Sequence, residues 1–289
     1  MRSRSEKVKD RRSKAKTAKI MNLLALLCGS LELFLPSSAT GQIVPDGTLG
    51  AESSAVTPAN VNGISSDRID GGATRGANLF HSFSQFNVRE SGAAYFANPA
   101  AIENILTRVT GSNASNIFGT LGVLGNANLF LINPHGIVFG PNARLDLGGS
   151  FVGSSANSLI FENGFEFSAA DPQGPPLLTI NIPIGLNLRQ NPGNIVVQGP
   201  GHNLRESDFV TVRDDRPEGL QVSPGQTLAL VGGEVVLSGG NLTAENGTVA
   251  LWSVLEGSLQ LTTSNGQLSL ENSRSTRSWE IFVWKKQLL

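Results

Sequence analysis

Residues 128–142 read Asn128-Leu129-Phe130-Leu131-Ile132-Asn133-Pro134-His135-Gly136-Ile137-Val138-Phe139-Gly140-Pro141-Asn142. Two apolar runs, 129–132 and 137–139, flank a turn at 133–136, and a second turn follows directly at 140–142. Each run has the length of a strand, and the proline and glycine between them mark changes of chain direction. Strands this short cannot offset the entropy of their own ordering, so we expect them to stack on neighbouring strands.

The same pattern of short apolar runs between turns of Gly, Asn, Ser and Pro recurs along the chain. It is found at 118–123, 129–132, 137–139, 145–147, 151–152 and 159–161, and again at 228–230, 235–237, 242–243, 249–251, 259–261 and 268–270. Three steps of this kind make one coil of roughly 20–25 residues, a period typical of a β-solenoid. A sandwich or barrel also uses many short strands, but its hairpins call for longer alternating strands than these. The sequence therefore favours an all-β fold, a right-handed parallel β-helix.

Three segments are predicted to depart from a regular coil. Residues 42–66 are expected to form an N-terminal cap, and the proline-rich segment 171–176 and the charged segment 205–218 to form extra-helical loops or hairpins. Residues 78–88 form a different kind of strand, because both of its faces carry an aromatic side chain. Such a strand is expected to pack on both sides.

The first 41 residues have the order of a secretory signal peptide: a basic stretch, an apolar run and then small residues. Cleavage after Ala39 or after Gly41 fits this order, and the second makes Gln42 the start of the mature chain. A membrane anchor is the alternative, but Gly29, Ser30 and Glu32 interrupt the apolar run.

Removal of residues 1–41 changes the charge and the redox chemistry of the chain. The segment holds nine of the 22 basic and three of the 23 acidic residues, so the remainder carries a net charge of about −7. It also holds Cys28, the only cysteine, which excludes disulfides and thiolate sites from the mature protein. No lysine occurs between Lys19 and Lys285, and this lack of a basic surface argues against a nucleic-acid partner.

The sequence gives little support for a catalytic site or a metal site. His81, His135 and His202 are far apart in sequence, and none has a second ligand at metal-binding spacing. Asp214 and Asp215 are adjacent, so on a strand their side chains point to opposite faces and do not converge. We therefore expect no catalytic residue, no metal and no cofactor, which weighs against the rival function of a carbohydrate-active β-helix enzyme. A structural glycan-binding surface protein is a second rival.

The motif Asn133-Pro134-His135-Gly136-Ile137 resembles the NPNGI motif of the two-partner secretion domain, the N-terminal domain of filamentous haemagglutinin-type exoproteins, with His135 replacing an asparagine. The likeness extends upstream to Asn98-Pro99-Ala100-Ala101, where the family often has NPNL, and to the segment 104–111. It extends downstream to 148–152, and it covers roughly residues 42–198.

This resemblance implies a secreted, non-enzymatic exoprotein. Its N-terminal domain would direct export through the periplasm and a partner outer-membrane β-barrel, whose periplasmic domains recognise it, and would nucleate folding of the β-helix. The product would lie outside a Gram-negative-type bacterium, secreted or at the cell surface, and mediate adhesion or haemagglutination-like contact with a host or cell-surface glycan or protein. Asn98, Pro99 and residues 133–137 have two open roles: corners of the fold, or the site that the export machinery recognises.

The last residues differ from the rest of the chain. Residues 273–289 hold Trp279, Trp284 and both lysines of the mature chain. We therefore divide the chain into a signal peptide at 1–41, a β-helix domain at 42–272 and an atypical tail at 273–289. The tail is expected to come from a truncated reading frame or to serve as a short cap for the end of the β-helix.

Overall fold

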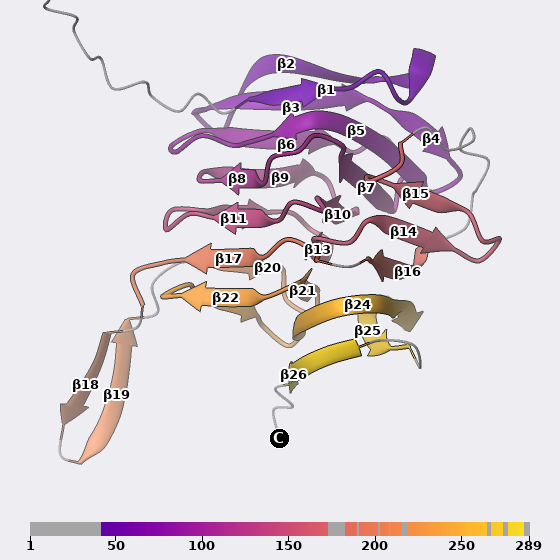
Figure 1. The fold of residues 1–289 in the computed structure, drawn as a ribbon. Coiled ribbons are helices and arrows are strands. Elements are labelled where there is room, and N and C mark those ends of the chain that lie inside the picture. Colours follow the sequence, from indigo (N-terminus) through magenta and orange to yellow (C-terminus); the bar gives the residue numbers. More distant parts are fainter. Residues whose placement is uncertain are drawn as a thin grey trace, which may run out of the picture. The chain divides into compact units, whose positions relative to one another are not determined.

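The computed structural model describes residues 42–172, 183–189, 191–201, 203–207, 209–215, 219–264, 267–273 and 277–285. All of them lie within one compact unit, Thr40–Leu289. The predicted signal peptide, with Ala39 and Gly41, lies outside these residues. Within them the chain is all-β with mostly parallel sheets (Figure 1) and contains one short 3-10 helix, η1 (Gly50–Glu52). None of the described helices is long and apolar enough to span a membrane.

Three sheets contain most of the parallel strands. Sheet A has β5 (Asn78–Phe86), β7 (Asn104–Val109), β10 (Asn128–Ile132), β13 (Phe151–Ser154), β21 (Thr227–Gly232) and β24 (Thr248–Ser264). Sheet B has β3 (Ile64–Gly71), β6 (Ala93–Ala97), β9 (Thr120–Leu124) and β12 (Arg144–Asp146). Sheet C has β8 (Ser115–Ile117), β11 (Ile137–Phe139), β17 (Ile195–Gln198) and β22 (Val235–Ser238). A further parallel pair joins β20 (Leu220–Val222) to β23 (Leu242–Ala244).

The chain visits these sheets in a repeating order. The repeats β7–β8–β9 and β10–β11–β12 each pass from sheet A to sheet C to sheet B, and each strand pairs with its counterpart one repeat away. The pairing is in register: Leu129 lies opposite Ile105 on one side and Phe151 on the other. The two apolar runs that open the sequence analysis are β10 and β11, and they do stack on neighbouring strands as predicted.

Sheet A separates two apolar cores. The first core is shared by the inward side chains of all three sheets, such as Leu129, Leu121 and Ile137, each fully buried. The second lies on the opposite face of sheet A, where Phe80, Leu106 and Phe130 are fully buried. The prediction that the strand at 78–88 packs on both sides is confirmed, because Phe80 and Phe83 of β5 belong to different cores.

The second core is completed by antiparallel strands. They are β14 (Ser158–Phe161), β15 (Glu166–Ser168), β16 (Pro183–Leu188), the second half of β24, and β25 (Gln267–Asn272). The runs 159–161, 259–261 and 268–270 were predicted to be regular coil strands, and this prediction is wrong. Their leucines instead cover the outer face of sheet A, whose aromatic side chains would otherwise be exposed to water.

The predicted run at 118–123 is also divided differently. Sheet C strand β8 ends at Ile117, and sheet B strand β9 begins only at Thr120. Gly119 forms the corner between them, and a Cβ atom there would lie 2.2 Å from the Gly92 carbonyl oxygen of the preceding repeat. The corner therefore needs glycine, which apolar patterning alone does not reveal.

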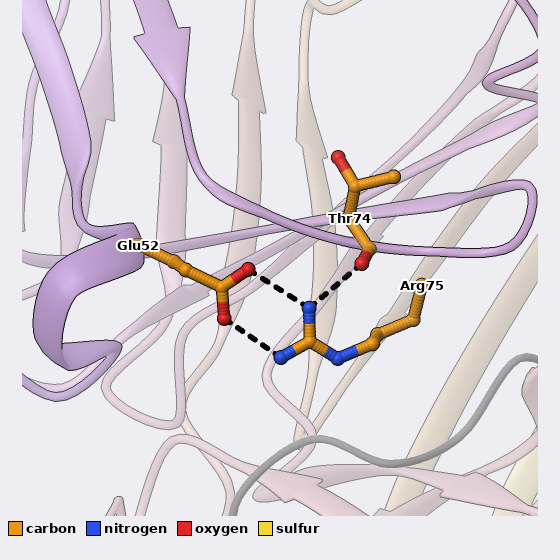
Figure 2. A network of polar contacts seen from close by, with 3 residues as sticks. All are labelled: Glu52, Thr74 and Arg75. Carbon is orange, nitrogen blue, oxygen red and sulfur yellow. Dashed lines mark hydrogen bonds and ion pairs between the residues drawn. The ribbon is translucent and has the colours of Figure 1, made fainter.

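The N-terminal cap closes sheets A and B with antiparallel strands. β1 (Ile43–Pro45) pairs with β5, and β2 (Ser54–Val61) pairs with β3 through a turn at Asn62-Gly63 in the left-handed region. Between them, η1 is joined to β4 (Ala73–Arg75) by the ion pair in Figure 2. There the Arg75 guanidinium donates to both Glu52 carboxylate oxygens, at 2.9 and 2.7 Å, and to the Thr74 carbonyl oxygen at 2.7 Å. Because Glu52 is exposed, this pair positions the cap more than it stabilises it.

Two later segments depart from the stack. β18 (Asn203–Ser207) and β19 (Val210–Asp215) form a two-stranded hairpin, which confirms a hairpin within the charged segment 205–218. β26 (Arg277–Lys285), in the predicted tail, runs antiparallel to β24. Of the predicted loop 171–176, only residues 171 and 172 are described, and they lie outside any strand.

Candidate functional site

The motif at 133–137 forms the corner between sheet A and sheet C. β10 ends at Ile132 and β11 begins at Ile137, and the Gly136 amide closes the turn by donating to the Asn133 carbonyl oxygen at 2.9 Å. The Asn133 side chain tightens the same turn, since its Oδ1 accepts from the His135 amide at 3.0 Å. Pro134 ends the strand because it has no N–H to donate, and Gly136 adopts a φ of +100° that disfavours other residues.

Asn133 is also anchored to the preceding repeat. Its Nδ2 donates to the Asn113 carbonyl oxygen and to Ser115 Oγ, both at 3.0 Å. Its backbone amide instead donates to the Ser154 carbonyl oxygen of the following strand β13, at 2.9 Å. The side chain is fully buried. Every polar atom of its amide group is therefore satisfied without water, as a buried polar group requires.

The following repeat covers the motif from the other side. The Gly193 amide donates to the Pro134 carbonyl oxygen at 2.9 Å, and the Ile137 amide donates to the Asn194 carbonyl oxygen at 3.1 Å. The approach is close: a Cβ atom on Gly136 would lie 2.5 Å from the Asn194 carbonyl oxygen. The motif thus fits between two neighbouring repeats, and substitution of Gly136 would separate them.

Only part of the motif reaches solvent in the folded domain. Asn133, Gly136 and Ile137 are buried, Pro134 is half-buried and His135 is exposed. A partner that binds the folded domain can therefore touch Pro134 and His135, whereas recognition of the other three residues requires an unfolded or partly unfolded chain.

Asn98 and Pro99 form a separate corner, after sheet B strand β6. The Ile102 amide donates to the Pro99 carbonyl oxygen at 3.2 Å, and Asn98 Nδ2 donates to the Ile102 carbonyl oxygen at 3.4 Å. Within this turn Ala101 has a φ of +69°, which is strained for a residue with a Cβ atom. The structure does not bring this corner together with Asn133, because the two lie at the ends of strands from different sheets.

A buried ladder of asparagines is a feature that the sequence analysis missed at these positions. Asn104 Nδ2 donates to Asn78 Oδ1 at 3.1 Å, and Asn128 Nδ2 donates to Asn104 Oδ1 at 3.0 Å. The ladder ends where Asn128 Oδ1 accepts from the Ser150 amide at 2.9 Å. The signal in the sequence is the repeated start Asn-Leu-Phe at 78 and 128 and Asn-Ile-Leu at 104.

His81 is a buried histidine beside the first core. Its Nδ1 lies 2.9 Å from Ser54 Oγ, and its ring contacts Phe83 and Phe96. Burial lowers the pKa of His81 to about 3, and the nearby Asp70 carboxylate only partly opposes this, so the imidazole is neutral at physiological pH. In the described part of the chain, no three His, Cys, Asp or Glu side chains are grouped so as to hold a metal ion. His202 lies outside it.

Gln42 is the predicted start of the mature chain. Gln42 is exposed, and its carbonyl oxygen accepts from the Asn87 amide at 3.0 Å. The peptide that precedes Gln42 joins it to Gly41, which lies outside the described residues.

Comparisons with known proteins identify the family of this chain and similar proteins. Residues 41–280 match the family described as "TPS secretion domain". The Heme/hemopexin-binding protein of Haemophilus influenzae is 27% identical over 155 residues, which are 54% of this chain and 15% of that protein. A crystal structure of the filamentous hemagglutinin secretion domain overlaps 72% of this chain and 98% of its own, with a TM-score of 0.39 and 14% identity. The family match covers most of the chain and includes the corner motifs at 98–99 and 133–137, and the chain therefore belongs to the TPS secretion domain family.

Proposed function

We propose that this chain carries the export signal of a two-partner secreted exoprotein and passes through a dedicated outer-membrane β-barrel. The observation that carries the proposal is the family match over residues 41–280, which includes the NPHGI corner. Export begins with cleavage of the signal peptide at Ala39 or Gly41 and entry into the periplasm. The partner's periplasmic domains then bind the mature chain, and the barrel releases it outside a Gram-negative-type bacterium, in the medium or at the cell surface.

The described strands support a right-handed parallel β-helix as the form that the exported chain adopts. Successive repeats pair in register through sheets A, B and C, and a core shared by all three sheets runs through them. In such an arrangement each repeat supplies a strand edge for the next one. Folding of the first repeats outside the cell therefore nucleates the rest and disfavours return of the chain.

The burial of the NPHGI motif supports recognition of the chain before it folds. Asn133, Gly136 and Ile137 become inaccessible once the repeats on either side have packed. In an extended chain the same residues are free, and an extended segment can add as a strand to the sheet edge of a partner domain. The motif then has two successive roles: it binds the partner while unfolded, and it becomes a corner afterwards.

The mature protein is proposed to mediate adhesion or haemagglutination-like contact with a host or cell-surface glycan or protein. It has no enzymatic role in this proposal, since Asp214 and Asp215, the adjacent acid pair, are consecutive residues of β19. The similarity to the Heme/hemopexin-binding protein covers only 15% of that protein, so it favours a shared export route without assigning the same ligand.

The decisive experiment is secretion with and without the cognate barrel. The chain is expressed in a Gram-negative host, and the culture medium and the periplasm are assayed by immunoblot, with N-terminal sequencing of the product. Appearance in the medium only with the barrel, starting near Gln42, is the expected result. Equal release without the barrel, or retention in the periplasm with it, would overturn the proposed route.

The variants Asn133→Ala and His135→Ala separate the two roles of the motif. Asn133→Ala removes three side-chain hydrogen bonds, one of them to the buried Ser115, so it should lower the stability of the purified domain by about 1–3 kcal/mol as well as its secretion. His135→Ala removes an exposed side chain and should leave stability within about 0.5 kcal/mol. Reduced secretion of His135→Ala at unchanged stability identifies direct recognition, whereas normal secretion of Asn133→Ala would contradict both roles.

A further inference from the structure

Arg108 of β7 is a buried cation that joins segments distant in sequence. Only 5% of the residue is exposed. Its Nε donates to Ser82 Oγ of β5 at 2.9 Å, and its Nη2 donates to Thr48 Oγ1 of the N-terminal cap at 2.8 Å. Its Nη1 donates to the Ser168 carbonyl oxygen of β15 at 2.7 Å, and its Cζ lies 4.3 Å from the ring centroid of Phe167. A buried guanidinium requires such partners, because an unpaired charge is strongly disfavoured in a protein interior.

The opposite charge is supplied by Asp46 of the cap, through intervening hydroxyl groups. Asp46 Oδ2 accepts from Ser82 Oγ at 2.8 Å and from Thr110 Oγ1 at 2.6 Å, and Asp46 Oδ1 accepts from the Thr48 amide at 2.9 Å. Burial alone would raise the pKa of Asp46, but these hydrogen bonds outweigh it and lower the pKa. Burial lowers the pKa of Arg108 to about 10, against the opposing effect of Asp46, so both groups are charged at neutral pH.

Apolar packing links the same segments. Phe80 of β5 lies on the outer face of sheet A, where its ring centroid is 5.0 Å from that of Phe167 and 5.9 Å from that of Phe161. All three rings are buried. The outer face of β5 and β7 is therefore completed by residues of β14 and β15, more than 50 positions later in the chain.

We propose that Arg108 is a latch that makes the N-terminal cap and the β14–β15 hairpin open and close as one unit. If β15 leaves, Arg108 loses the Ser168 carbonyl oxygen and the Phe167 ring, and water enters beside Thr48 and Asp46. If the cap leaves, the guanidinium loses Thr48 and the counter-charge of Asp46, and its remaining bonds to β15 weaken. The first repeats are thus completed only when β15 has docked. This property of the folded domain goes beyond the proposed function and does not depend on it.

Native-state hydrogen exchange on the mature chain tests this coupling. Phe167→Leu trims the β15 ring that packs against the Arg108 guanidinium, at a position outside the cap. We expect amide protection to fall at least tenfold at the β14–β15 hairpin, for example at Ala169 directly after β15. Protection should fall by the same factor at the amides of Asp46 and Asn87, which join the cap to the rest of the domain by donating to the Ser82 and Gln42 carbonyl oxygens. Loss of protection in β14–β15 alone, with Asp46 and Asn87 unchanged, would overturn the proposal.

Two further variants isolate the role of Arg108. In Arg108→Met and in Thr48→Val, each of which cuts the connection between cap and β15, Phe167→Leu should no longer change protection at Asp46 and Asn87. Thr48 is only half-buried, so Thr48→Val keeps the test available if Arg108→Met does not fold. Arg68→Met is the matched control, because Arg68 makes an exposed ion pair with Asp70 and should leave the coupling intact. Coupling that persists in both latch variants would show that packing alone joins the two segments.

Discussion

Acidification from pH 7 to pH 5 should destabilise the folded domain through one buried side chain, His81. Its ring is fully buried in the first core, with Nδ1 beside Ser54 Oγ and no hydrogen-bond partner for Nε2 among the described residues. A second proton would place a charge among Phe83, Phe96 and neighbouring apolar groups. Burial therefore lowers the pKa to about 3, from an ordinary value of 6.5.

The sign and the size follow from linkage between protonation and folding. Between pH 6.5 and pH 3 the unfolded chain binds a proton at His81 that the folded chain does not, so the free energy of unfolding decreases as the pH falls through this window. The expected loss is about 2 kcal/mol at pH 5, and it reaches about 4 kcal/mol near pH 3. Asp46, whose pKa is lowered despite burial because of its hydroxyl and amide hydrogen bonds, loses its contribution as the pH falls from the ordinary aspartate value of 3.8 through the lowered folded pKa, and so acts outside the range between pH 7 and pH 5.

Urea unfolding at pH 7, 6 and 5, followed by tryptophan fluorescence from the buried Trp252, measures this loss directly. The variant His81→Gln cannot bind the second proton, so its stability should change little over this range, even if it is lower than wild type at pH 7. His135→Gln is the control, because His135 is exposed, and it should keep the full decrease. A decrease of about 2 kcal/mol that survives in His81→Gln, or a wild type that is equally stable at pH 7 and pH 5, would refute the argument.

Three further predictions concern the corners and the ladder. Asn104→Ala should lower the free energy of unfolding by about 2–4 kcal/mol, since it removes the hydrogen bond that Asn104 donates to Asn78 Oδ1 and the one that it accepts from Asn128 Nδ2. Urea titration checks this against the exposed control Asn142→Ala, and a loss below about 0.5 kcal/mol would contradict the ladder. Ala101→Gly should raise the free energy of unfolding by about 0.5–1 kcal/mol, because glycine adopts the φ of +69° without strain. The gain should appear as an increase in Tm, and a lower Tm would show that the strain is absent. Gly136→Ala should lower the free energy of unfolding by about 2 kcal/mol or more, because φ is +100° and the new Cβ atom would lie 2.5 Å from the Asn194 carbonyl oxygen. Limited proteolysis of the variant should then cut near residue 136, and a variant as resistant as wild type would argue against the close packing.

The regular strands could be predicted from the sequence because their signal is local. The runs at 129–132 and 137–139 are short and bounded by proline and glycine, and the structure places β10 and β11 there with boundaries that differ by at most one residue. The roles of the later runs could not be predicted in this way. An apolar run such as 159–161 has the same composition whether it continues a parallel sheet or covers that sheet from outside, and only the position of the second core distinguishes the two.

The polar parts of the fold were harder to predict, for a physical reason. Asn133 can be identified from the sequence because it begins the NPNGI-like motif at a turn, but its partners Asn113 and Ser115 lie about 20 positions away and carry no signal of their own. Arg108 was passed over for the same reason, since its partners come from residue 48 and from residues 82 and 168. Interactions between residues distant in sequence become visible only once the repeats are aligned.

The asparagine ladder disfavours pairing of the first strands in a wrong register. A slip of one residue between β7 and β10 would place Asn128 opposite Ile105 and leave buried amide groups unsatisfied, while the side chains of Phe130 and Leu129 would exchange faces. Apolar side chains alone discriminate poorly between such registers, since Leu, Ile and Phe fill similar space. In the correct register each asparagine also accepts a hydrogen bond from the next strand through its Oδ1. The pairing of β5 with β7 and the pairing of β7 with β10 therefore each require the correct alignment.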